Sequence, residues 1–358
     1  MLRDFTRRKT DNKFIKKSQL NFCDQCRGFD IRLSSFIKES VGEAPVSRVI
    51  YVGTPKEMGE RGYCQLCRLL FKACCDGPLR HLFPEFVESS DTQADHYPVK
   101  LAGAWQVESS AMYLSFWPVL YVTHANVNIV VRPLSPEFED HPSFARSITS
   151  PFLDINLIKR WMRKCEIHHV GSPCDEKTWS NIKHNTGPLE GTGCNFHTID
   201  VYDYCITQHD ESCRYLALSY CWGPQAQLLL TKEKVASMKR FGGLRGYASQ
   251  IPATIMDAVV LTAGLGERYL WVDSLCIIQD EEASRNTTID NMHKIYLQAS
   301  LVIIAGDGSR ASDGLAGVQS TRKANQFMDK CGPGPDLCAQ FDVKDYLSQS
   351  HYFTRGWT

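Results

Sequence analysis

Two Cys-x-x-Cys pairs, Cys23–Cys26 and Cys64–Cys67, are spaced to hold a metal ion. Each pair can bind one ion from a tight turn, so the two pairs together can complete a tetrahedral zinc site of four thiolates. The gap between the pairs is longer than in ordinary zinc ribbons. A second interpretation stays open, because the second pair also fits a helical apolar stripe in which cysteine is a small buried hydrophobic residue. The members of that stripe are Tyr63, Cys64, Cys67, Leu70, Phe71 and Cys74.

Polar residues also follow three short apolar runs in the second half of the chain. Ser219, Tyr220 and Trp222 follow the first run, Asp273 the second and Asp307 the third. Ligands of open parallel sheets bind beyond the carboxyl ends of the strands, where the loops converge. We call this expected edge the rim, and we expect it to bind a ligand through Ser219, Tyr220, Trp222 and Asp273.

Each rim residue also allows a structural use. Asp273 can orient a ribose hydroxyl or cap the loop that follows it. Tyr220 and Trp222, placed on one side by strand alternation, can stack on a flat heterocycle or pack against the next helix. Cys276 is a nucleophile by residue type, but its apolar flanks and the distance of His293 along the chain favour a buried, unreactive thiol.

The elements that would position the rim alternate as β-α-β-α-β, which predicts a parallel sheet with helices on its faces. The first helix should begin near Pro252, bury a stripe and end at Gly264 or Gly266. The second should follow the cap signal at 286–288 and lead into the third strand. The two expected stripes are Ile255, Ala258, Val259 and Thr262, then Ile289, Met292, Tyr296 and Ala299.

Four motifs of this region resemble one known family. They are Ala-Leu-Ser-Tyr-Cys-Trp-Gly at 217–223, Leu-Trp-Val-Asp-Ser-Leu-Cys-Ile-Ile-Gln-Asp at 270–280, Met-His-Lys-Ile-Tyr at 292–296 and Arg-Gly-Trp-Thr at 355–358. In this order they are similar to the fungal heterokaryon-incompatibility (HET) domain from about Thr198 onward. The resemblance implies a domain that triggers cell death when incompatible individuals fuse. It would act through self-association or a protein partner, and its last motif adds Arg355 and Trp357 to the ligand-binding residues.

The HET family is also thought to be remotely related to Toll/interleukin-receptor (TIR) domains, some of which cleave NAD with one glutamate. This implies a TIR-like core and leaves enzyme activity open, as an NAD glycohydrolase with NAD as substrate. The family's glutamate would lie just past Thr358, so we expect the chain to be truncated at this motif. Without that glutamate the catalytic residue is unknown, and Asp273 or Asp307 would have to stand in for it.

The sequence as a whole predicts four segments, of which the HET domain is the last. These are a basic mobile tail at 1–20, a Cys-rich α+β region with a small antiparallel sheet at 21–150, a linker and helix at 151–197, and the HET domain at 198–358. Strands are expected within 98–133. A helix over 157–165 should pack Trp161 against the HET domain, which we prefer to a metal site formed by Cys165, His168 or His169, and Cys174.

Composition narrows the classes of function. Forty basic and forty acidic residues leave a formal net charge of zero, so no global charge favours nucleic acid or anionic membrane. Polar residues interrupt the apolar window at 111–131, which argues against a membrane span. The first twenty residues lack a secretory signal, so fifteen cysteines are expected as reduced thiols in the cytoplasm. The phosphate-binding glycine motifs and the nucleophile elbow are absent from the sequence, which argues against kinase, dehydrogenase and α/β-hydrolase folds.

Overall fold

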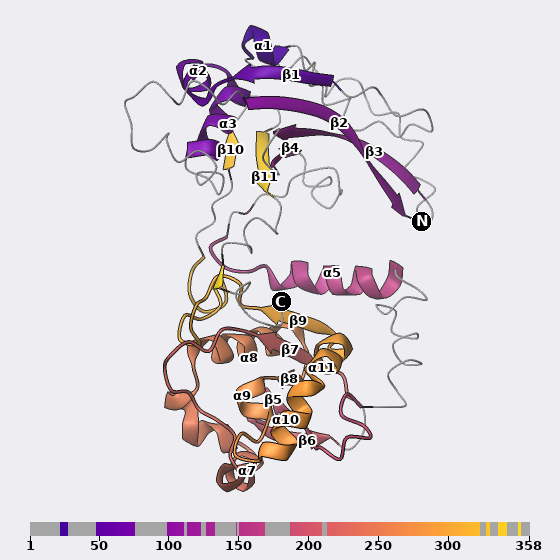
Figure 1. The fold of residues 1–358 in the computed structure, drawn as a ribbon, viewed down its shortest axis with the longest axis vertical. Helices are drawn as coiled ribbons and strands as arrows, with labels where there is room; N and C mark the ends of the chain where they lie inside the picture. Colours follow the sequence, from indigo (N-terminus) through magenta and orange to yellow (C-terminus); the bar gives the residue numbers. More distant parts are fainter. Residues whose placement is uncertain are drawn as a thin grey trace. The chain divides into compact units, whose positions relative to one another are not determined.

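The computed structural model describes residues 22–27, 48–75, 99–110, 113–122, 127–132, 148, 150–168, 187–209, 213–322, 327–329, 336–341 and 350–351. The chain divides into two compact units (Figure 1). The first combines Met1–Thr149 with Asn325–Tyr346, and the second combines Ser150–Ala324 with Leu347–Thr358. Residues 325–346 were predicted to belong to the HET segment at 198–358, but they group with the first unit. The expected tail at 1–20, residues 133–147 and residues 169–186 of the expected linker segment lie outside the described residues.

The first unit contains an antiparallel sheet in the order β1-β2-β3-β4-β11-β10. The small antiparallel sheet expected within 98–133 is confirmed, and the apolar window at 111–131 lies largely in two of its strands. No helix in the described part of the chain is long and apolar enough to cross a membrane. The strands are β1 (Arg48–Gly53), β2 (Val99–Ser110), β3 (Tyr113–Val122), β4 (Val127–Arg132), β10 (Phe327–Asp329) and β11 (Asp336–Phe341).

Three helices belong to the same unit: α1 (Asp24–Arg27), α2 (Pro55–Glu60) and α3 (Gln65–Cys75). A capping box starts α2, because the Thr54 hydroxyl accepts from the Glu57 backbone and the Glu57 carboxylate accepts from the Thr54 backbone. Arg68 of α3 forms a two-pronged ion pair with Asp329 of β10, at 2.8 and 2.9 Å. This pair connects a helix early in the chain to a strand near its end.

The second unit contains a five-stranded sheet in the order β6-β5-β8-β7-β9. Its strands are β5 (Phe196–Asp200), β6 (Cys205–His209), β7 (Leu216–Ser219), β8 (Tyr269–Trp271) and β9 (Leu301–Ile304). The three predicted strands are parallel. The parallel β-α-β-α-β arrangement is therefore confirmed for these three strands, but the sheet also contains β5 and β6, which form an antiparallel hairpin that β5 joins to β8. A short connection between two strands allows only antiparallel pairing, so the sheet is mixed.

The first predicted helix is α8 (Ala253–Leu265), with Pro252 at its N-cap and Gly266 at its C-cap in the left-handed conformation. All four residues of its expected stripe are buried. The second predicted helix is interrupted. It forms α10 (Glu282–Asp290) and α11 (Met292–Gln298), with Asn291 between them. The expected cap signal at 286–288 was wrong, since these residues lie inside α10.

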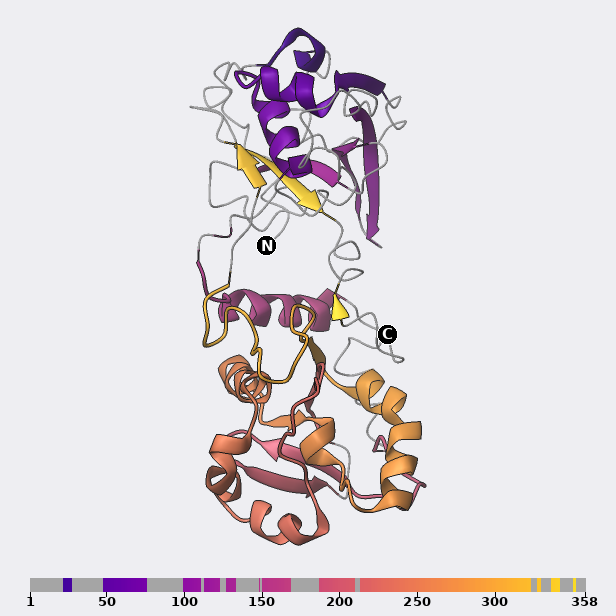
Figure 2. The same cartoon turned by 60° about the vertical axis from the view of Figure 1, so that its left-hand side comes forward.

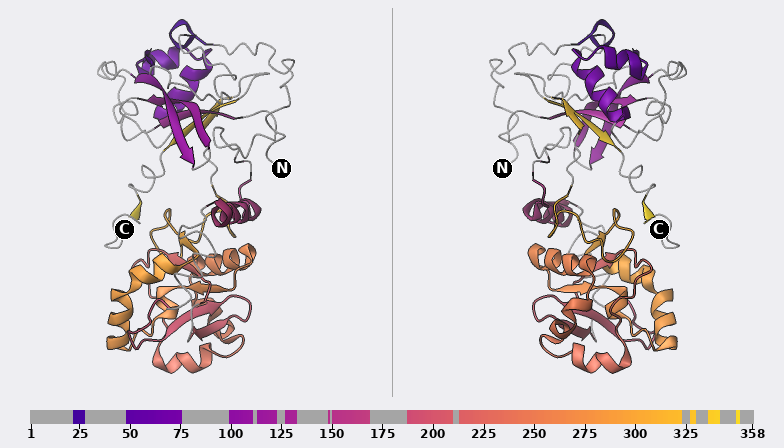
Figure 3. Two further views of the ribbon diagram at one scale, coloured as in Figure 1. Left: turned by 90° about the vertical axis from the view of Figure 1, so that its right-hand side faces the viewer. Right: turned by 90° about the vertical axis from the view of Figure 1, so that its left-hand side faces the viewer.

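Helices cover both faces of this sheet (Figures 2 and 3). On the α11 side, the Tyr215 hydroxyl donates to the Ile295 carbonyl at 2.6 Å and Trp271 meets Tyr296 edge-on. The α8 helix lies on the other side, and α5 (Ile155–His168) packs beside it. Because both faces are covered, every residue of β7 is buried.

The helix predicted at 157–165 is therefore confirmed as part of α5, but its contact residue is different. Trp161 is 53% exposed, so the expected packing of this side chain was wrong. Ile155, Ile158 and Met162 pack against the core instead.

Candidate functional site

The rim brings together Trp222, beyond β7, and Asp273, which begins the short helix α9 (Asp273–Cys276) after β8. The Trp222 indole nitrogen donates to both oxygens of the Asp273 carboxylate, at 3.1 and 3.0 Å. The Ser274 backbone N–H donates to the same carboxylate at 2.7 Å. Asp273 therefore acts as a charged acceptor that fixes the indole ring and also binds the next backbone N–H of its own turn.

Tyr220 is buried beneath this pair. Its hydroxyl forms hydrogen bonds with Gln227 Oε1 and Ser274 Oγ, each at 3.0 Å. Burial, followed by the nearby charge of Asp273, raises the pKa of Tyr220 well above its usual value. The ring is enclosed by protein, which corresponds to the packing interpretation of this residue and not to an open stacking platform.

The loop after β9 lies beside the loop after β7. The Ala305 backbone donates to the carbonyl of Ser219 at 2.9 Å, and the Ala311 backbone donates to the carbonyl of Trp222 at 3.1 Å. Gly223 has a φ of 74°, and a Cβ built there would lie 2.7 Å from Cγ of Arg310. Glycine is required here both for the backbone conformation and for this close approach. Asp307 lies on the same loop and is exposed.

A cavity of about 330 Å³ opens beside Trp222. Its walls come from the loop after β7, from the end of the 3₁₀ helix η5 (Gly243–Gln250), from the start of α8 and from the loop after β9. Asp273 and Asp307 do not line it. The polar side chains of the lining were not predicted from the sequence, since loop glutamines and serines follow no periodic pattern; they are Gln225, Gln227, Ser249, Gln250 and Ser312.

Gln227 gives the cavity a specific polar feature. Its Nε2 is buried and has no hydrogen-bond partner among the described residues, while its Oε1 accepts from Tyr220. A buried amide donor without a partner is costly. An acceptor oxygen of a ligand in this cavity would relieve that cost.

Cys276 and His293 do not form a nucleophile and base. Cys276 is buried behind the rim, and this burial raises the pKa of its thiol. His293 is exposed on α11, where its ring nitrogen Nδ1 lies 3.1 Å from the carbonyl of Asp290. The predicted burial of Cys276 is confirmed, and a buried thiol with a raised pKa is expected to be unreactive.

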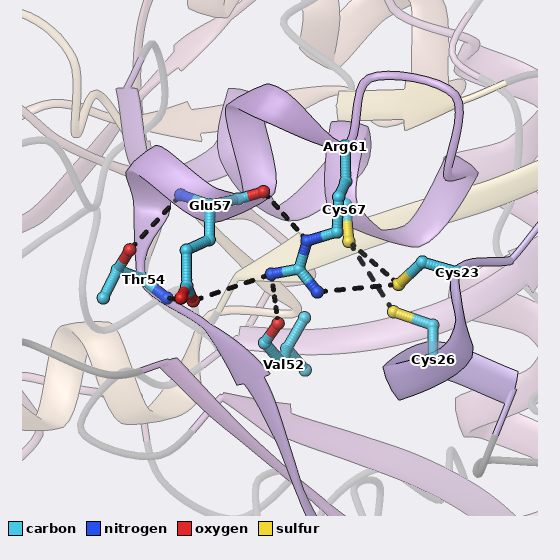
Figure 4. Close-up of polar contacts among 7 residues, drawn as sticks. All are labelled: Cys23, Cys26, Val52, Thr54, Glu57, Arg61 and Cys67. Carbon is cyan, nitrogen blue, oxygen red and sulfur yellow. Dashed lines mark hydrogen bonds and ion pairs between the residues drawn. The ribbon is translucent and has the colours of Figure 1, made fainter.

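The two Cys-x-x-Cys pairs meet in the first unit. All four thiols are buried, and their sulfur atoms lie within 4.8 Å of one another. Cys67 Sγ is 3.7 Å from Sγ of both Cys23 and Cys26 (Figure 4). We call this group the cysteine cluster. The predicted apolar stripe of this helix is confirmed only in part. Cys64 and Cys67 are buried at the start of α3, whereas Tyr63 is 63% exposed.

Several other candidate residues are not brought to either site. Cys165 is exposed on α5. The side chains of the other proposed ligands, His168 or His169 and Cys174, lie outside the described part of the chain. Arg355 and Trp357, the last two expected ligand-binding residues, also lie outside the described residues.

Residues 215–358 match the family model of the heterokaryon incompatibility proteins (HET). The match covers the strands β7, β8 and β9 and all residues of the rim, and it confirms the resemblance carried by the sequence motifs. This part of the chain is therefore a HET domain. No curated protein and no solved structure matches the chain.

Proposed function

We propose that the HET domain at residues 215–358 promotes regulated cell death of the heterokaryon-incompatibility type, in the cytoplasm, through self-association or a protein partner. One observation carries the proposal: Trp222 and Asp273, which belong to two separate family motifs, hold each other at the rim. Strand tips that converge beside a cavity are the usual place for recognition in such a sheet.

Apolar residues near one edge of the sheet support association with another protein. In the strand order of the described sheet, β9 is the last member. Its Ile304 is 45% exposed, and Leu297 at the end of α11 is 76% exposed. An edge strand with apolar side chains is a natural surface for pairing with another chain.

Cleavage of NAD is the second candidate function, and the cavity gives it less support. Glycosidic cleavage needs a carboxylate beside the ribose to stabilise the positive charge of the transition state. The cavity lining contains no carboxylate within the part of the chain that the structure describes. The Asp273 carboxylate, next to the cavity, is instead engaged by Trp222 and by the Ser274 backbone.

Induced expression of the full chain in a filamentous fungus tests the proposal. Hyphal viability is followed with a dye that enters only dead cells, and the purified chain is incubated with NAD while nicotinamide release is measured. We expect hyphal death together with no release of nicotinamide. Healthy hyphae at high expression would contradict the death-promoting role, and steady release of nicotinamide would favour the enzyme.

A variant of the exposed edge separates association from the other properties of the domain. Ile304→Lys places a charge on β9 and removes no hydrogen bond of the Trp222–Asp273 pair, so we expect weaker self-association or partner capture and reduced death. Sedimentation velocity and co-purification measure the association directly. Unchanged association in this variant would show that the β9 edge is not the surface used.

A further inference from the structure

We propose that the cysteine cluster of Cys23, Cys26, Cys64 and Cys67 holds one structural Zn²⁺ ion. This site lies in the first unit and is independent of the proposed function of the HET domain. Each pair straddles the start of a helix: Cys23 precedes α1 and Cys26 lies in it, while Cys64 precedes α3 and Cys67 lies in its first turn. The geometry thus repeats one metal-binding turn twice.

The distances between the sulfur atoms fit coordination of one metal ion and exclude a disulfide bond. With Zn–S bonds of about 2.3 Å, tetrahedral geometry separates the sulfur atoms by about 3.8 Å. Cys67 Sγ lies 3.7 Å from each of the two sulfur atoms of the first pair. A disulfide requires a separation of about 2.0 Å, and all four thiols are free.

The ligand set also identifies the kind of site. Four thiolates fill all four tetrahedral positions of zinc and leave none for water or substrate, which is typical of structural centres. The four side chains are buried and come from two segments that are separate in sequence. An ion at this position would join the segment around α1 to the start of α3 and so stabilise the first unit.

Arg61 supplies the positive charge that such a centre needs. Zinc with four thiolates carries a net charge of −2, which is costly to bury without a nearby cation. The Arg61 guanidinium points at the cluster, with its Nη1 3.7 Å from Cys23 Sγ (Figure 4). Two backbone carbonyls fix its orientation, since Nη2 donates to Val52 at 2.6 Å and Nε donates to Glu57 at 2.9 Å.

We assign Arg61 as a positioning residue on this basis. It contacts a ligand sulfur and not the metal, and its orientation follows from the capped helix α2 that carries Glu57. Groups that orient metal ligands typically change metal affinity by about 10- to 100-fold when they are replaced.

Elemental analysis of the purified full chain is the first test. We expect about one zinc ion per chain, as four thiolates complete one tetrahedral site. Cys26→Ser and Cys67→Ser should each lose the ion. Cys338→Ser is the matched control, because Cys338 is a buried cysteine of the same unit outside the cluster, and it should keep the ion. A chain purified without zinc, or with iron in its place, would overturn the proposal.

Two measurements on the unaltered chain remain decisive even if the serine variants fail to fold. Co²⁺ exchanged for zinc should give the intense visible absorption of a tetrahedral thiolate complex. Removing the metal with a chelator should make four additional thiols reactive to a thiol reagent, matching the four cysteines of the cluster. Absence of the Co²⁺ spectrum, or the same number of reactive thiols before and after chelation, would overturn the proposal.

Competition with a chromophoric zinc chelator tests Arg61. Arg61→Gln should weaken zinc binding by about tenfold. Arg61→Lys keeps the positive charge but cannot reproduce both hydrogen bonds to the carbonyls of Val52 and Glu57. It should therefore weaken zinc binding by less than Arg61→Gln does. Equal zinc affinity in Arg61→Gln and the unaltered chain would overturn the role assigned to this residue.

Discussion

Replacing Asp273 with asparagine removes the charge that holds Trp222 at the rim. The carboxylate accepts from the indole N–H at 3.0 and 3.1 Å and from the Ser274 backbone at 2.7 Å. A hydrogen bond to a charged group contributes about 1.5–3 kcal/mol, and the partial exposure of Trp222 favours the lower end. We expect Asp273→Asn to lower the free energy of unfolding of the second unit by about 1.5–2 kcal/mol.

A double-mutant cycle isolates the contact from other effects of each substitution. Trp222→Phe keeps an aromatic ring but removes the N–H donor, and alone it should cost about 1.5 kcal/mol. The double variant should cost about 2 kcal/mol, which leaves a coupling energy of about 1 kcal/mol between the two side chains.

Hydrogen exchange followed by mass spectrometry is the suitable assay, because the slowest amides in the peptide over 269–280 report on the second unit alone. A coupling of about 1 kcal/mol corresponds to a roughly fivefold deviation from additive exchange rates. Asp307→Asn paired with Trp222→Phe is the control and should be additive. Additivity within about 0.3 kcal/mol for the Asp273 pair would show that Trp222 and Asp273 are not energetically coupled.

Three further predictions concern other contacts of the two units. Gly223→Ala combines a positive φ with a clash against Arg310 and should destabilise the second unit by about 1–3 kcal/mol, measured by thermal unfolding; an unchanged midpoint would contradict this. The pKa of His197 is lowered to about 4, mainly by burial and then by the charges of Lys239 and His209. Between about pH 6.5 and pH 4, His197 is therefore protonated in the unfolded chain but neutral in the folded chain. Stability should fall by up to about 3 kcal/mol as the pH drops from about 6.5 to about 4, and His197→Gln should flatten that slope. Asp329→Asn breaks the two-pronged pair with Arg68 and should speed amide exchange in β11 about tenfold, equivalent to about 1.4 kcal/mol; unaltered exchange would show that the pair does not anchor this part of the sheet.

Much of the second unit could be predicted from the sequence because its local signals agree with its packing. The strands β7, β8 and β9 are apolar runs that become buried on both faces, and Pro252 and Gly266 bound α8 as expected. The hairpin β5–β6 was not predicted, because its turn depends on a distant contact. The Asp200 carboxylate accepts hydrogen bonds from the backbone N–H groups of Tyr202 and Asp203, each at 3.0 Å. Arg268, which directly precedes β8, donates to the same carboxylate at 2.7 Å.

The misplaced helix start at 286–288 has a local cause. Threonine can cap a helix or return its hydroxyl to a carbonyl one turn earlier. Thr287 and Thr288 do the latter, bonding to the carbonyls of Ala283 and Ser284 at 2.9 and 2.8 Å. Sequence alone does not distinguish these two uses.

The candidate sites were predictable to different degrees. The meeting of Trp222 and Asp273 followed from parallel topology, because both residues lie just beyond adjacent strands. The cysteine cluster followed from spacing, although spacing alone left the helical interpretation of Cys64 and Cys67 open. The cavity could not be predicted, since its walls come from four segments that meet only after folding.

We propose that the rim is the surface through which the HET domain acts. The most direct measurement is the fraction of dead hyphae after equal expression of the unaltered chain, Trp222→Ala and Phe241→Ala, with folding checked by circular dichroism. Phe241 is 75% exposed on the same unit and is not among the residues that line the cavity. If the rim is this surface, hyphae should die with the unaltered chain and with Phe241→Ala, and survive with a folded Trp222→Ala. Undiminished death with Trp222→Ala would contradict it.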